Sequence, residues 1–268
     1  MEEIRNYKSI YKSKRAKLAT LVATIATTIF VIFSALVFVA NKTFDYAVVE
    51  GLSMYPTINA TAKTTTINDY AYYSTNKRVA RGDIIIVDYI DTGSDIDAIK
   101  RLIAIAGDTI CYYNGNILLN GEVLTETYLE NGYEYLKNNP NALKLSGYTT
   151  ADDWKDDEYT AQKNRFESWC KKLVNGTMEE YEKRTEFFKN FSTNYSNCIR
   201  YDETIDGYVL TIPKNHIFFL GDNRLNSSDC NTFGPIENKY LKAKVCFVTT
   251  GQLPITVVIT KKILHLFD

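Results

Sequence analysis

The longest feature of the hydrophobic pattern is an uncharged apolar run near the start of the chain. It reads LATLVATIATTIFVIFSALVFVA from Leu18 to Ala40. As a helix rising about 1.5 Å per residue, it would be roughly 34 Å long, which is enough to cross a bilayer. A cleaved signal peptide has a shorter apolar region and small residues before its cut, whereas this run is long and ends Phe38-Val39-Ala40. We therefore expect an uncleaved transmembrane anchor over residues 18–40.

The charges that flank the apolar run predict its orientation. Only Lys42 follows it closely, whereas six cations precede it: Arg5, Lys8, Lys12, Lys14, Arg15 and Lys17. The positive-inside rule places the cation-rich flank in the cytoplasm. We therefore expect a single-pass protein of the cell membrane, with residues 1–17 cytoplasmic and residues 41–268 extracytoplasmic.

Strand-like patterns dominate residues 41–124. Short apolar runs such as DIIIVDY at 83–89 are followed by Asn-Gly pairs at 114–115 and 120–121. Such pairs between apolar runs are typical of tight hairpin turns. Many short strands joined in this way predict a mostly β, antiparallel body.

Residues 125–206 are different: they are polar, and their apolar positions follow a helical period. One set lies at i, i+3, i+4 and i+7: Phe166, Trp169, Cys170 and Leu173. A second set keeps a similar period: Met178, Tyr181, Thr185 and Phe188. The alternative is a solvated, partly disordered insertion, but the many aromatic residues favour two amphipathic helices that form an inserted cap.

The strand pattern returns in residues 207–268. Its last part, VCFVTTGQLPITVVIT at 245–260, is uncharged but contains Gly251 and Pro254. This run is too short and too interrupted for a second membrane span, so we expect paired strands there. The predicted fold is thus a mostly β, antiparallel catalytic body in two parts, 41–124 and 207–268, with one N-terminal transmembrane helix and an α-helical cap.

Charge and cysteine content exclude several kinds of site. The net charge of -1 gives no basic face for nucleic acid. The five cysteines show no CxxC pair, so neither a metal site nor a disulfide framework is indicated. Because their number is odd, at least one is a free thiol or forms an intermolecular bond.

Elimination leaves few catalytic chemistries. The two histidines, His216 and His265, lie in apolar contexts typical of packing, and the chain has no HExxH, GxGxxG, P-loop or GxSxG motif. We therefore expect no metal and no cofactor. A serine without a histidine needs another base, and a lysine can serve if burial lowers its pKa. Lys100, which enters the apolar run LIAIA, is the best candidate, although periodicity alone better fits a charge at a strand edge.

Four short blocks, in order, resemble one family. They are SMYPT at 53–57, RGDIIIV at 81–87, KRLIAIAGD at 100–108 and GDNRLNSSD at 221–229. Together they resemble the bacterial type I signal peptidases, which are Ser-Lys membrane proteases. The resemblance covers the anchor and most of the β body and leaves residues 125–206 largely unmatched.

The resemblance implies a role for several residues. Ser53 would be the nucleophile and Lys100 its general base, with Arg101 as a basic partner. Ser227 would orient the lysine through its hydroxyl, and Asp229 would belong to a supporting ion pair, while 221–224 would shape the site. In EGLSMYPTIN, Pro56 fixes φ and Met54 can be buried beside the serine, so we interpret this stretch as the nucleophile turn and assign both residues to the substrate side.

The chain departs from the family pattern at three places. Gly51 stands where many relatives carry a serine that donates a second oxyanion hydrogen bond. Cys230-Asn231 follows Asp229 where the family usually has Ser-Arg, so we expect Arg101 to replace that arginine as the partner of Asp229. The cap is the third departure, and we expect it to narrow or redirect the choice of substrate.

These expectations combine into one function. The chain would be an anchored serine endopeptidase that removes signal peptides from exported preproteins through an acyl-enzyme, with small residues at the first and third positions before the cut. Its partners would be preproteins and membrane lipid. The alternatives are a peptidase dedicated to a narrow set of surface or pilus subunits and a catalytically weak binding or scaffold protein. A self-cleaving repressor of the same superfamily would need a DNA-binding segment and no anchor, which is the opposite of this chain.

Overall fold

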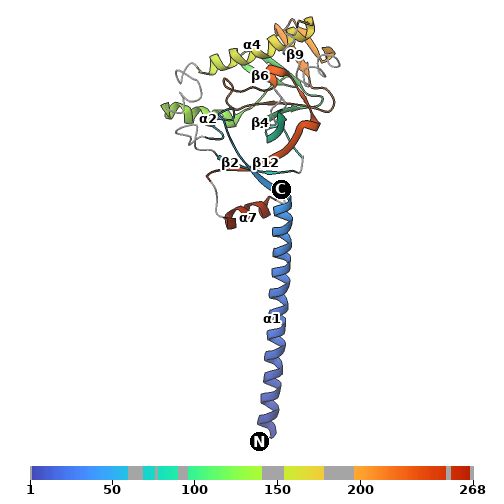
Figure 1. The fold of residues 1–268 in the computed structure, drawn as a ribbon, viewed down its shortest axis with the longest axis vertical. Coiled ribbons are helices and arrows are strands. Elements are labelled where there is room, and N and C mark those ends of the chain that lie inside the picture. The colour runs from blue at the N-terminus through green and yellow to red at the C-terminus, as the bar shows by residue number, and fades with distance from the viewer. Residues whose placement is uncertain are drawn as a thin grey trace. The chain divides into compact units, whose positions relative to one another are not determined.

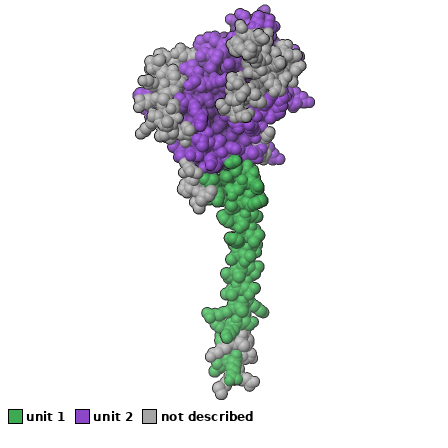
Figure 2. Space-filling model, viewed as in Figure 1, with its two compact units in different colours: residues 1–45, 253–268 green, residues 46–252 purple. Residues whose placement is uncertain are grey.

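The computed structural model describes residues 2–59, 69–75, 78–89, 96–140, 154–177, 196–251 and 255–265. The chain forms two compact units (Figure 2): residues 1–45 with 253–268, and residues 46–252.

The first unit contains the predicted anchor within helix α1, Glu2–Thr43 (Figure 1). Its stretch Tyr11–Thr43 is long and apolar enough to cross a membrane, by length and composition. The hydroxyls in this stretch donate to carbonyls four residues earlier, at Thr20, Thr24, Thr27 and Thr28. These four hydroxyls are therefore satisfied within the helix, as polar groups in lipid must be.

The end of the chain corrects the prediction of paired strands over 245–260. Strand β12 covers Leu241–Thr250, but residues 255–264 form helix α7, Ile255–Leu264. Val258 and Lys262, four residues apart, are both buried, and Lys262 Nζ donates to Phe44 O at 3.0 Å. The β-branched residues suggested strand, but packing of this helical face decides the structure.

The second unit is built on two antiparallel sheets, which confirms the predicted fold class. The seven-stranded sheet has the order β1-β2-β12-β3-β4-β10-β11 and the five-stranded sheet the order β7-β6-β5-β9-β8. The other strands of the first sheet are β1 Phe44–Val48, β2 Asp69–Ser74, β3 Ile84–Tyr89, β4 Ile96–Ile105, β10 His216–Leu220 and β11 Ile236–Glu237. Those of the second are β5 Thr109–Tyr113, β6 Asn116–Leu119, β7 Glu122–Val123, β8 Ile199–Asp202 and β9 Gly207–Thr211.

Both predicted Asn-Gly hairpins are present in the second sheet. Asn114 and Gly115 join β5 to β6 with φ values of 47° and 79°. Asn120 and Gly121 join β6 to β7 with φ values of 56° and 85°. Positive φ at both central residues is the geometry of a tight two-residue hairpin, which Asn-Gly adopts at little cost.

The 125–206 segment contributes two long described helices, α2 Thr127–Asn138 and α4 Trp154–Asn175. The four periodic residues of the first predicted helix lie on α4 and are all buried, so that helix is confirmed. The second predicted helix, from Met178 to Phe188, lies outside the described residues. The same segment also supplies strand β8 and a short 3-10 turn, Ser196–Cys198, before it.

Helix α4 packs against strand β9 and the short helix α6, Cys230–Phe233 (Figure 1). It joins the main core, which combines residues of β4, β5, β9 and β10 with the buried face of α4. A second 3-10 turn, Asn238–Tyr240, leads into β12. Helix α4, which comes from the segment that sequence marked as an insertion, is therefore part of the core of the second unit.

Candidate active site

The structure brings Ser53 and Lys100 together. Ser53 lies in the turn after β1, and Lys100 lies within β4, paired with Ile85 of β3. Lys100 Nζ is 2.8 Å from Ser53 Oγ and 3.3 Å from the carbonyl oxygen of Ile99. This is hydrogen-bond distance between a hydroxyl nucleophile and a possible base.

Burial sets the protonation state of the lysine. Lys100 is 5% exposed, and this desolvation lowers its pKa below the ordinary value for a lysine. The carboxylate of Asp229 opposes the shift most, followed by Cys230 and Asp222. Because desolvation is the largest effect, the neutral amine is accessible at lower pH than in water.

Apolar packing supports the turn that contains Ser53. Met54 and Ile58 belong to a small core cluster with Ile86 and Ala243. Pro56 is also buried, and its ring lies against Gly132 of α2, where an added Cβ would be 3.0 Å from Pro56 Cγ. Met54 and Pro56 therefore support the turn, and neither lines the groove that contains Ser53.

Asn223 holds the main chain of the turn from the other side. Its amide N–H donates to Ser53 O at 3.0 Å, and its side chain Nδ2 donates to Leu52 O at 3.0 Å. The same Leu52 carbonyl also accepts from Tyr55 N. Since peptide groups are planar, fixing Leu52 O also fixes the direction of the Ser53 N–H.

Arg101 pairs with Asp222, so the predicted Arg101–Asp229 pair is wrong. Nε and Nη2 of Arg101 donate to the two oxygens of Asp222 at 2.8 and 2.6 Å. Successive residues of a strand point to opposite faces, which separates Arg101 from Lys100. Asp229 instead accepts from the backbone N–H groups of Gly221 and Asn231, at the start of α6.

The Asp222 carboxylate links three segments of the site. Besides Arg101, it accepts from Thr57 Oγ1 at 2.6 Å, so it connects β4 to the nucleophile turn. The guanidinium of Arg101 lies 3.7 Å from the ring centroid of Tyr128 on α2, in cation–π contact. Sequence reasoning gave Asp222 and Asn223 only a general shaping role, although both stand in the matched block GDNR.

Ser227 lies beside the nucleophile but does not bond to the lysine. Its Oγ is buried and has no hydrogen-bond partner among the described residues, so the expected bond to Lys100 is absent here. A Cβ added to Gly221 would come within 2.3 Å of Ser227 Oγ and 2.4 Å of Ser53 O. Glycine is thus required at 221 because the loop and the turn approach so closely.

Gly51 begins the turn with a positive φ of 82°. An added Cβ would meet nothing within 4 Å, so conformation, not space, favours glycine here. Gly51 O accepts from the side chain of Asn59 at 2.9 Å. The residue has no side-chain donor to offer an oxyanion.

The dyad opens into a groove of about 680 Å³. Its walls come from residues 47–50 and strands β2, β3, β4 and β12. They include the small or apolar side chains of Val49, Ile86, Ala98, Ile99 and Ala243 and the charged side chains of Glu50, Asp97 and Lys242. A groove lined by several strands suits an extended peptide.

Other sequence features have structural roles. His216 is buried at the start of β10, and its Nδ1 lies 3.0 Å from Lys214 O. All five cysteines are free thiols. Among the described residues, no group of three or more His, Cys, Asp or Glu gathers as a metal site.

Comparison with known proteins gives a consistent result. The family described as "Signal peptidase, peptidase S26" matches residues 20–250. Signal peptidase I of Aquifex aeolicus (strain VF5) is 27% identical over 235 residues, which are 84% of this chain and 84% of that protein. Signal peptidase I of Streptococcus pneumoniae serotype 4 is 26% identical over 199 residues, 74% of this chain and 78% of that protein.

Two further matches are more limited. Signal peptidase I S of Bacillus subtilis (strain 168) is 28% identical over 115 residues, 40% of this chain and 59% of that protein. A crystal structure of a signal peptidase I from Enterococcus faecalis V583 matches with a TM-score of 0.31 and 20% identity, covering 63% of this chain and 97% of that one.

Proposed function

This chain belongs to the signal peptidase family, peptidase S26, and from that premise we propose that it is an anchored serine endopeptidase that cuts signal peptides through a Ser53–Lys100 dyad. The observation that carries the proposal is the 2.8 Å contact between Ser53 Oγ and the buried Lys100 Nζ. A charged lysine could only donate to the hydroxyl, whereas a neutral one can remove its proton.

The reaction begins with proton transfer from Ser53 to neutral Lys100. Ser53 Oγ then attacks the scissile carbonyl, and the lysine delivers the proton to the leaving amine, which leaves an acyl-enzyme. A water that loses its proton to the same lysine hydrolyses the ester and releases the signal peptide. Lys100 thus acts as base and acid in both halves of the reaction.

The Ser53 N–H supplies one donor to the oxyanion of the tetrahedral intermediate. The hydrogen bonds of Asn223 to the carbonyls on either side of that N–H hold it in place before substrate arrives. Donors fixed in advance stabilise developing charge without reorganisation during the reaction. Because Gly51 offers no side-chain donor, the second hydrogen bond to the oxyanion comes from water or from a donor that rearranges when substrate binds.

Substrate binds as an extended strand in the groove, with small side chains next to the cut. The apolar walls beside Ser53 admit alanine-sized residues at the first and third positions before the cut. Helix α1 anchors the enzyme in the cell membrane, with its basic end cytoplasmic, and confines enzyme and preprotein to one surface.

The test is cleavage of a lipid-embedded preprotein with an Ala-x-Ala site by the full chain. We expect a cut after the second alanine by the parent, and none by Ser53→Ala or Lys100→Met, which keeps the length of the lysine side chain without its amine. Lys171→Met, at an exposed position of α4, is the matched control and should cut like the parent.

Failure of a folded parent to cut would contradict a general signal peptidase. A panel of exported surface subunits would then test for a narrow substrate range. Cutting by Ser53→Ala would remove the dyad from the mechanism.

A further inference from the structure

The residues 221–229, here the site loop, carry Asp222, Ser227 and Asp229 past the nucleophile. The loop begins directly after Leu220, which pairs with Arg101 of β4. Its first residue, Gly221, lies against Ser53 O, as the close approach of an added Cβ shows. Any displacement of this loop therefore reaches the dyad.

One side chain of α4 holds the main chain of this loop at two points. Arg165 Nη1 donates to Ser227 O at 3.2 Å, and Nη2 donates to Arg224 O. The two carbonyls are three residues apart, and a planar guanidinium can bind both at once in a fixed geometry. Both acceptors are backbone carbonyls, so these bonds hold the path of the main chain whichever side chains the loop carries.

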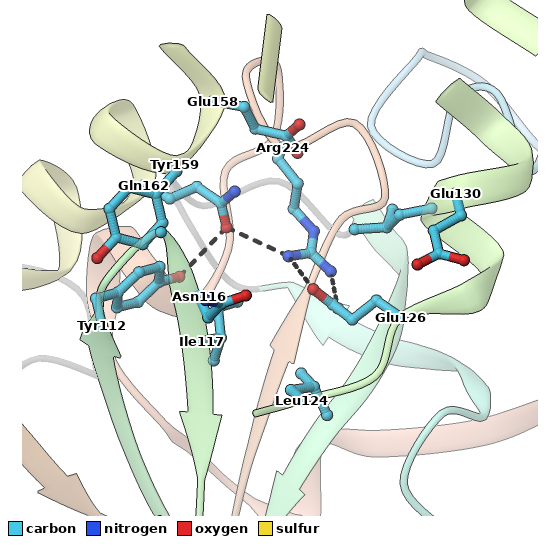
Figure 3. Close-up of a pocket in the computed structure, with 12 residues that line it drawn as sticks. Tyr112, Asn116, Ile117, Leu124, Glu126, Glu130, Glu158, Tyr159, Gln162 and Arg224 are labelled. Atoms are coloured by element: carbon cyan, nitrogen blue, oxygen red, sulfur yellow. Dashed lines mark hydrogen bonds and ion pairs between the residues drawn. The ribbon is translucent and has the colours of Figure 1, made fainter. Parts of the chain in front are cut away.

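One helical turn before Arg165, Gln162 contacts the same region. Gln162 Oε1 accepts from Arg224 Nη1 at 3.3 Å and lies 3.2 Å from Tyr112 OH (Figure 3). Asn231, which follows the loop, lies in the same group, since its Nδ2 donates to Tyr112 OH at 2.8 Å. Residues 162 and 165 share one face of the helix, so α4 presents both to the loop.

Arg224, in the middle of the loop, is itself fully buried. Its guanidinium forms an ion pair with Glu126, just before α2, and Figure 3 shows it reaching from the loop toward that carboxylate. A buried charge must keep its partners, which resists outward movement of the loop.

Helix α4 is a rigid support for these contacts. Trp169, one turn after Arg165, lies so close to Gly234 that a Cβ there would approach its ring to 2.1 Å. Phe166 and Cys170 of α4 belong to the main core with Phe219 and Cys230. The helix therefore cannot shift without disturbing the strand and helix on either side of the site loop.

We propose that Arg165 is a positioning residue for the peptidase reaction: it holds the site loop against the Ser53–Lys100 dyad, so that the inserted helix α4 is part of the catalytic apparatus. The proposal rests on the proposed function. Release of the loop would admit water to Lys100 and weaken the burial that keeps its amine neutral.

The test compares Arg165→Gln, Arg165→Lys and the exposed control Lys171→Gln in the full chain. With the Ala-x-Ala preprotein, Arg165→Gln should lower kcat by about 10²-fold, the scale of a displaced catalytic geometry, and change KM much less. Its pH–rate profile should shift to higher pH. Lysine can donate but cannot bind both carbonyls in the same plane, so Arg165→Lys should restore part of the rate, and Lys171→Gln should match the parent.

Hydrogen exchange tests, without any substrate, whether Arg165 holds the site loop in place. The amides of 221–229 should exchange faster in Arg165→Gln than in the parent, while those of β4 keep their protection. If the parent cuts no preprotein, the proposed function fails. Hydrogen exchange alone then decides whether Arg165 stabilises the site loop.

Three results would overturn the proposal. They are an Arg165→Gln enzyme with the parental kcat and pH profile, a loss of rate that only tracks a loss of folded protein, and unchanged exchange of the site loop.

Discussion

At the scale of single residues, the proposed chemistry depends on the protonation of one buried amine. Lys100 must be neutral to take a proton, and its pKa is lowered by burial, so activity should rise with pH through that lowered pKa. A pH–rate profile of preprotein cleavage measures this. The rise should lie below the pH at which an exposed lysine loses its proton, and a profile flat from mildly acid to strongly basic pH would contradict Lys100 as the base.

The Arg101–Asp222 pair makes a second prediction at this scale. The side chains of Arg101 and Asp222 are 8% and 0% exposed. Removing one partner leaves a buried, unpaired charge, so Asp222→Ala should lower the free energy of unfolding by about 3–5 kcal/mol. Denaturant unfolding of the full chain in detergent micelles measures the change.

The control for this prediction is an ion pair open to solvent. Lys244 and Asp83 are 2.9 Å apart, with side chains 36% and 21% exposed. Lys244→Ala should therefore cost no more than about 1 kcal/mol. Equal losses of unfolding free energy in Asp222→Ala and Lys244→Ala would show that the buried Arg101–Asp222 pair stabilises the fold no more than an exposed pair does.

Sequence predicted the residues of the dyad better than their surroundings. The order of four blocks predicted that Ser53 and Lys100 act together, and the structure places their side chains 2.8 Å apart. Periodicity alone treats a lysine at the start of an apolar run as an edge charge. The partner of Arg101 was predicted wrongly because the choice between Asp222 and Asp229 depends on where β10, which leads into the site loop, pairs with β4. That register joins segments more than a hundred residues apart, which local patterns do not contain.

At the scale of elements, α4 shows how an unmatched segment becomes structural. Trp169 is 3% exposed and fills the space over Gly234. Trp169→Ala should lower the free energy of unfolding by about 3–5 kcal/mol through lost burial and the cavity left behind. Val174 on the same helix is 49% exposed, so Val174→Ala should change stability by less than about 0.5 kcal/mol.

Thermal or denaturant unfolding of both variants checks this prediction. A Trp169→Ala protein as stable as the parent would mean that packing of α4 contributes little to stability. That result would contradict the assignment of α4 to the core.

The elements that sequence predicted well are those whose structure is determined by neighbouring residues in the chain. The Asn-Gly turns specify their own geometry, and the period of Phe166, Trp169, Cys170 and Leu173 defines a buried helical face. Helix α7 was missed because its β-branched residues favour strand locally, while its buried positions are fixed by contacts with α1 within the first unit.

At the scale of the whole molecule, the proposed function assigns anchoring to one unit and chemistry to the other. All residues of the dyad, the groove and the site loop lie in the unit 46–252, whereas the apolar helix lies in the other. Under the proposed function, substrate recognition is therefore a property of the second unit. The first unit would then decide on which side of the membrane, and at what surface concentration, the reaction takes place.

The orientation of the anchor is testable on intact membranes. The cations before the apolar run favour a cytoplasmic N-terminus, because basic flanks are retained on the cytoplasmic side. Protease added to spheroplasts that express the chain with an N-terminal tag should digest residues 46–268 and leave the tag protected. Replacing the six flanking cations by glutamine should reduce this bias and yield a fraction with the body protected. A parent whose tag is digested while its body survives would reverse the orientation, and would place the dyad on the wrong side of the membrane to meet a translocated preprotein.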